Sequence, residues 1–146
     1  MPSNKEYQKM VEKASPNSSL GRNMLSAFLV GGIICCIGQA FADLYIYLGI
    51  SREKATTLAS VTLIFLAVLL TGLKKFNNLA KIGGAGALVP ITGFANAMSS
   101  TAIEFKNEGF VLGVGANIFK IAGPVIAYGT AASVIYGVIY WITTLF

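Results

Sequence analysis

Long stretches without a charged residue dominate the sequence. No Asp, Glu, Lys or Arg occurs in residues 23–42, 55–73 or 121–146. Each stretch is long enough for a membrane-spanning helix, which needs roughly 17–25 residues. Charged residues make up only 12% of the chain, whereas soluble domains average about 25%. Because so few charges cannot cover the surface of a 146-residue chain, we expect much of that surface to face lipid.

This pattern predicts an all-α polytopic membrane protein. We expect three to four transmembrane helices plus a helical hairpin that is interrupted by Gly and Pro and is re-entrant in one interpretation. The chain divides into a cytoplasmic amphipathic N-terminal segment, 1–22, and a single membrane domain, 23–146. Within that domain we place spans at about 23–48, 52–75 and 124–144, and interrupted or re-entrant helices at about 83–122.

The last span is predicted to begin at a break formed by Gly123 and Pro124. Proline suits the first turn of a helix, where its missing N–H is not needed. Residues 124–144 then give about 31 Å of helix at 1.5 Å per residue. That length is enough to cross a hydrocarbon core of about 30 Å.

The N-terminal segment has the features of a short amphipathic helix over residues 3–14. Ser3 and Glu6 have the spacing of a capping box. A helix lying on the membrane surface is one interpretation, and a frayed polar tail is the other. The apolar face would hold Tyr7, Met10, Val11 and Ala14.

Lys and Arg residues are concentrated on one predicted side of the membrane. Residues 1–22 hold four of them and the 74–81 loop holds three, whereas the loop between the first two spans holds two. Because cytoplasmic loops carry an excess of Lys and Arg, we expect the N-terminus and the 74–81 loop to be cytoplasmic.

A Gly- and Pro-rich region between residues 83 and 122 does not resemble an ordinary span. It predicts two helical pieces, Pro90–Phe105 and Glu108–Ala122, with Asn107 capping the second. Each piece is about 22–24 Å long, which is short for a crossing. The residues that we expect to break the helices or act as hinges are Gly83, Gly84, Gly86, Pro90 and Gly93, together with Gly123 and Pro124.

The sequence "EFKNEG" at 104–109 separates these two pieces. If both pieces are broken or thin spans, the turn is an external loop. If they form a hairpin that enters from the cytoplasmic side, the turn is its tip within the membrane. Irregular backbone at that depth is tolerated only inside protein or beside a watery cavity, as in the interrupted helices of transporters.

Lys120 is an ionisable residue in a long apolar tract, and Asn117 lies on about the same helical face. An intramembrane charge is by default a candidate functional residue. The alternative is that Lys120 reaches the membrane surface with its flexible side chain.

Small residues at four-residue spacing predict close helix packing. The adjacent cysteines are interpreted as small apolar residues, without a disulfide or metal role. The predicted packing residues are Gly31, Gly32, Cys35 and Cys36 in the first span, and Gly129, Ser133 and Gly137 in the last.

Catalytic and nucleotide-binding patterns are missing from the sequence. There is no His, no placed nucleophile, no P-loop and no dinucleotide-binding glycine motif. We therefore predict a protein that is not an enzyme, uses no cofactor and has no metal site. The net charge of +5 is explained by cytoplasmic loops and anionic membrane lipid rather than by nucleic acid.

Four segments resemble the SpoVA membrane proteins of spore-forming bacteria. The basic N-terminal extension and "FKIAG" are similar to the AC type of that family rather than to the AE-type paralogue. The segments are "AFLVGGIICCIGQ" (27–39), "LLTG" (69–72), "GAGALVPITGFANAMSS" (84–100) and "EFKNEGFVLGVGANIFKIAG" (104–123).

The resemblance implies a function in the spore inner membrane, in sporulation and germination. SpoVA proteins are associated with moving dipicolinic acid, as its calcium chelate, across that membrane. The resemblance also implies a channel subunit, opened by membrane tension and assembled as a homo- or hetero-oligomer. Its implied partners are the AE-type paralogue and a soluble thiolase-like SpoVA subunit. The alternative is a structural subunit that scaffolds a complex and conducts nothing.

Polar residues of the interrupted region are the candidates for a solute path. We expect amide and hydroxyl groups to bind the carboxylates of dipicolinate, cations to offset its charge, and glutamates to meet calcium, which prefers oxygen ligands. The amide and hydroxyl candidates are Asn96, Ser99, Thr101 and Asn117, the cations are Lys106 and Lys120, and the glutamates are Glu104 and Glu108.

Overall fold

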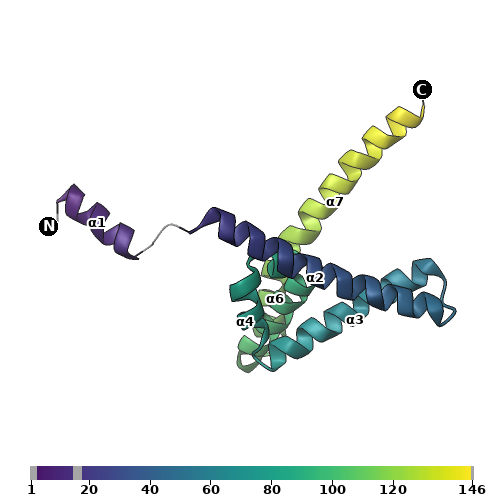
Figure 1. The fold of residues 1–146 in the computed structure, drawn as a ribbon, viewed down its shortest axis with the longest axis horizontal. Helices are drawn as coiled ribbons and strands as arrows, with labels where there is room; N and C mark the ends of the chain where they lie inside the picture. Colours follow the sequence, from purple (N-terminus) through teal and green to yellow (C-terminus); the bar gives the residue numbers. More distant parts are fainter. Residues whose placement is uncertain (1–2, 15–17, 146) are drawn as a thin grey trace.

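The computed structural model describes residues 3–14 and 18–145, and every regular element in them is a helix (Figure 1). Three helices are long and apolar enough to cross a membrane: Leu20–Tyr47, Arg52–Gly72 and the continuous Phe110–Thr144. The predicted all-α membrane fold class is thereby confirmed.

The N-terminal helix α1, Asn4–Ala14, stands apart from the other helices (Figure 1). The predicted capping box is confirmed. The Ser3 backbone N–H donates to Glu6 Oε2 at 2.8 Å, and the Glu6 N–H donates to Ser3 Oγ at 3.4 Å. These bonds satisfy backbone donors that the first helical turn leaves free.

Helices α2, Leu20–Tyr47, and α3, Arg52–Gly72, form an antiparallel pair (Figure 1). Their connection includes Gly49 at φ 87°, a left-handed conformation that favours glycine. The Tyr45 hydroxyl and Thr62 Oγ1 share a hydrogen bond of 2.7 Å across the pair. Alanines are buried along both helices, because small side chains let membrane helices approach closely: Ala42, Ala55, Ala59 and Ala67.

Helix α4, Phe76–Gly83, occupies most of the segment that we predicted to be the 74–81 loop, so that prediction is wrong. Phe76, Leu79 and Ala80 recur at the helical spacing of three and four residues. Phe76 is only 1% exposed and packs with Ala67 and Ala95. The burial of this apolar face stabilises a helix here, although two lysines, Lys74 and Lys75, directly precede it.

The chain turns twice after α4 and forms a short helical hairpin. Gly84, at φ 48°, separates α4 from α5, Ala85–Leu88. Pro90 then precedes α6, Ile91–Glu104, which agrees closely with the predicted piece Pro90–Phe105. Gly86 and Gly93 lie inside these helices, so the prediction that they break the chain is wrong.

The second predicted piece, Glu108–Ala122, does not exist as a separate helix. A 3₁₀ turn, η1 (Lys106–Glu108), leads to Gly109 at φ 95°. A π-helical segment, η2 (Phe110–Gly115), follows and continues into α7, Ala116–Thr144. Asn107 is therefore not the predicted cap, because the left-handed Gly109 separates it from the helix.

Gly123 and Pro124 do not begin the last span, because α7 runs through both. Proline inside a helix removes one hydrogen bond and bends the chain without always ending the helix. Neighbouring groups in membrane proteins often compensate for that loss. The last helix that is long and apolar enough to cross a membrane therefore begins at Phe110 rather than at Pro124.

The turn at 104–109 lies at the same end of the bundle as the C-terminus of α3 (Figure 1). One pocket there is lined both by Lys74, which follows α3, and by Glu104, the last residue of α6. The sequence "EFKNEG", predicted as an external loop or a membrane-embedded tip, therefore begins beside the end of α3 and not at the opposite end of the bundle. The hairpin that enters and returns is α4–α5–α6, and its tip lies near Gly84 and Pro90.

The outer part of α7 lies outside this small bundle. Ala122 is the last buried residue, and every described residue from Pro124 to Leu145 is exposed. The helix projects away from the other elements (Figure 1). This arm is apolar, so lipid or another membrane helix is the environment that suits it.

Candidate functional site: a polar contact between α3 and α6

One face of α6 carries polar side chains and packs along α3. Asn96, Ser99 and Ser100 are three and four residues apart, which places them on one side of a helix. All three are half-buried. Ala95 meets Ala67 of α3 in the core, and two alanines at the contact bring the helix backbones close together.

Thr71 of α3 and Asn96 of α6 form the central polar contact. Thr71 Oγ1 donates to Asn96 Oδ1 at 2.8 Å and lies 2.7 Å from the Ala67 carbonyl oxygen. A hydroxyl has one proton, so the two oxygens compete for it. The bond to Asn96 can therefore open without leaving the hydroxyl unpaired, which makes this contact exchangeable.

A pocket of about 140 Å³ opens beside this contact, where α3 and α6 end. Its charged groups are the Lys74 ammonium and the Glu104 carboxylate, and amide and hydroxyl groups complete its polar surface. Lys74 adopts φ 59°, the left-handed conformation that often ends a helix. The pocket is lined by Thr71, Lys74, Phe76, Asn77, Ser100, Ile103 and Glu104.

The predicted path residues fall into separate groups. Asn96 and Glu104 belong to the α3–α6 contact and its pocket. The Ser99 hydroxyl donates within its own helix, to the Ala95 carbonyl oxygen at 2.8 Å. Thr101 is 7% exposed, and it lies on a different face from Ser99, because two helical residues turn about 200°.

Lys106 and Glu108 lie in the exposed turn η1. Both residues are exposed and lie outside the buried core of the bundle. Among residues 3–14 and 18–145, no group of three or more His, Cys, Asp or Glu side chains is placed so that it could hold a metal ion.

Asn117 and Lys120 form a pair on α7. Lys120 Nζ donates to Asn117 Oδ1 at 2.9 Å, and Asn117 Nδ2 donates to the Gly113 carbonyl oxygen at 2.9 Å. Lys120 is exposed. From Lys120 to Tyr140 the helix rises about 30 Å, which matches a hydrocarbon core. This spacing favours the interpretation that Lys120 reaches one membrane surface.

The small residues predicted for helix packing differ in what surrounds them. A Cβ added at Gly31 would lie 3.4 Å from the Gly86 backbone; at Gly83, which was predicted as a break, it would lie 2.6 Å from Val30 Cγ1. Added at Gly32, Gly129 or Gly137, it would meet no described atom beyond its chain neighbours and its own helix backbone within 4 Å. Cys35 and Cys36 are exposed free thiols. The Ser133 hydroxyl donates to the Gly129 carbonyl oxygen at 2.8 Å.

Gly93 is a second site of close backbone approach. A Cβ there would lie 2.1 Å from the Leu88 carbonyl oxygen. This glycine lets the chain fold tightly from α5 into α6 around Pro90. Thr92, beside it, is 7% exposed, and its hydroxyl has no hydrogen-bond partner among the described residues.

Sequence reasoning missed Thr71, Lys74, Asn77, Ser100 and Thr92. Lys74 and Asn77 were assigned to a connecting loop, and Thr71 was one of several hydroxyls in an apolar span. Ser100 carried a signal, because it follows Ser99 and lies one turn before Glu104. No sequence signal pointed to the hydrogen bond between Thr71 and Asn96, because the two residues are 25 positions apart in the chain.

Comparisons with known proteins agree with the resemblance drawn from the sequence. A family model described as SpoVAC/SpoVAEB sporulation membrane protein matches residues 23–139. The chain is similar to stage V sporulation protein AC of Bacillus subtilis (strain 168), with 45% identity over 134 residues that cover 91% of this chain and 89% of the relative. No solved structure matches it. With most of its length matched, the chain belongs to the SpoVAC/SpoVAEB family of sporulation membrane proteins.

Proposed function

We propose that the chain is a pore-forming subunit in the spore inner membrane. Through it, dipicolinic acid crosses as its calcium chelate in sporulation and germination, and membrane tension opens the path. The observation that carries this proposal is the exchangeable Thr71–Asn96 contact beside a pocket with both a cation and a carboxylate.

The chemistry of this pocket suits such a solute. Dipicolinate is a planar dianion whose charge is largely neutralised by chelated calcium. Lys74 can attract its carboxylates, Glu104 can meet the calcium, and the amide and hydroxyl groups can replace water around both. The candidate path runs along the polar face of α6, with Asn96 inside and the η1 turn at its entrance.

The path needs further subunits. The pocket of about 140 Å³ is smaller than the roughly 300–1,000 Å³ of typical ligand sites, and the three spanning helices are mostly exposed. We therefore propose assembly with an AE-type paralogue or further copies of this chain, on which the soluble thiolase-like subunit docks.

Neighbouring lysines provide a matched test of the path. Lys74 lines the pocket, whereas the exposed Lys75 does not. In liposomes that contain the chain and its AE-type paralogue, Lys74→Met is expected to slow dipicolinate release about tenfold, which corresponds to about 1.4 kcal/mol. Lys75→Met should keep the wild-type rate. Equal rates for all three proteins, at equal membrane levels, would contradict the proposed path.

The alternative function is a structural subunit that conducts nothing. The exposed arm of α7, 124–145, favours it, because a scaffold also needs free apolar helices for its partners. The same liposomes separate the two functions. If the paralogue alone releases dipicolinate at the rate of the mixture, this chain scaffolds the assembly rather than forming its path.

A further inference from the structure

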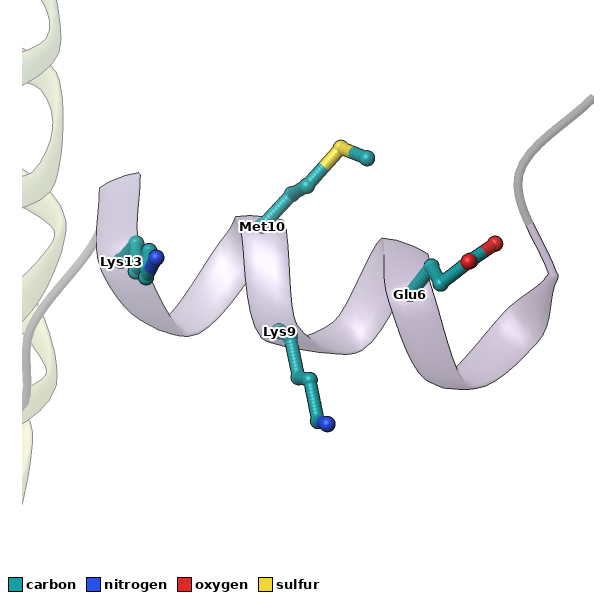
Figure 2. Close-up of a pocket in the computed structure, with 4 residues that line it drawn as sticks. All are labelled: Glu6, Lys9, Met10 and Lys13. Atoms are coloured by element: carbon teal, nitrogen blue, oxygen red, sulfur yellow. The ribbon is translucent and has the colours of Figure 1, made fainter.

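The helix α1 carries an apolar face that the chain itself does not cover. Tyr7, Met10 and Val11 are 62%, 56% and 45% exposed. They recur at spacings of three and four residues, so they share one side of the helix. Lys9 leaves the helix in a different direction from Met10 (Figure 2). The helix is therefore amphipathic and requires an apolar surface outside the described chain.

Its length supports the need for such a surface. The helix has 11 residues, and isolated helices shorter than about 12–15 residues are marginal in water. Its capping box stabilises only the first turn. Burial of the apolar face is the remaining source of stability.

The position of α1 identifies the nearest apolar surface. Five residues lie between Ala14, where α1 ends, and Leu20, where the spanning helix α2 begins, so six residue-to-residue steps connect them. An extended chain of that length reaches at most about 21 Å. The helix is thus tethered close to the membrane surface from which α2 departs.

The net positive charge of this segment favours a membrane surface with anionic lipid headgroups. Residues 1–22 hold four Lys or Arg residues and two Glu residues. Each basic residue near an anionic bilayer contributes about 1 kcal/mol. Lys9 and Lys13 lie along the surface of α1 beside Met10 (Figure 2).

We propose that α1 lies in the headgroup layer of an anionic membrane, with Met10 toward the acyl chains and Lys9 toward water. The partner is an anionic phospholipid surface. This interaction anchors the N-terminal segment beside the bundle and is independent of the solute path.

Spin labels placed on the full-length chain test the proposal. Single labels are introduced as Met10→Cys or Lys9→Cys in a background with Cys35→Ala and Cys36→Ala. In phosphatidylglycerol vesicles, the Met10 label should collide often with oxygen, which enters lipid, and rarely with a water-soluble nickel chelate. The Lys9 label, as the matched control, should collide readily with the chelate.

Charge reversal tests the role of anionic lipid. Because each lysine contributes about 1 kcal/mol, Lys9→Glu with Lys13→Glu should lower the membrane-bound fraction of α1 at least about tenfold. Neutral phosphatidylcholine should also release it. Equal burial of the Met10 label in neutral and anionic vesicles would overturn the proposal. So would protection of that label from both oxygen and chelate, because that result would mean docking on protein.

Discussion

At the scale of single residues, a close backbone contact at Gly86 holds the short hairpin α4–α6 against α2. A Cβ at Gly86 would lie 2.0 Å from the Ala27 carbonyl oxygen, so the backbones of α5 and α2 touch. We predict that Gly86→Ala pushes them apart and costs about 1–3 kcal/mol, as overpacking does. Gly32→Ala is the control, because its Cβ would meet no described atom within 4 Å. The measurement is thermal unfolding in detergent, and equal midpoints for the two variants would refute the close approach.

At the scale of an element, α7 contains a weak point where its buried part meets its exposed arm. Pro124 has no N–H, so the Lys120 carbonyl oxygen lacks its helical donor. We predict that Pro124→Ala strengthens the helix here and slows amide hydrogen exchange in residues 116–130 by about tenfold or more, since interior proline costs up to about 3 kcal/mol. Val125→Ala should leave exchange nearly unchanged. Unaltered exchange in Pro124→Ala would mean that neighbouring groups already compensate.

At the scale of the whole molecule, the three spanning helices determine which ends share a side. The hairpin α4–α6 returns to the end of the bundle where α3 stops, so it adds no crossing. We predict that the N-terminus and the η1 turn lie on one side and the C-terminus on the other. Lys106→Cys, with Cys35 and Cys36 replaced, should therefore be labelled only from the side of the N-terminus. Labelling from the side of a C-terminal tag would contradict this topology.

The sequence allowed several residues of the candidate site to be predicted, but it did not show which of them lie together in space. Asn96 and Glu104 were predicted, and the structure places both at the α3–α6 contact. Lys120 was grouped with them because it interrupts an apolar tract, yet it pairs with Asn117 on a different helix. Helical periodicity shows which residues share a face. It does not show which helix that face meets.

Patterns in the sequence were enough to predict the helical class, the two spans before residue 73, the capping box and the break at Pro90. These features are local, because charge-free length, hydrogen-bond spacing and the fixed φ of proline act within a few residues. Three features became visible only in the folded chain: 76–83 is a helix, α7 continues through Pro124, and 104–109 returns to the end of α3. The burial of Phe76 and the approach of Gly86 to Ala27 depend on contacts between distant segments, and such packing can override local preference.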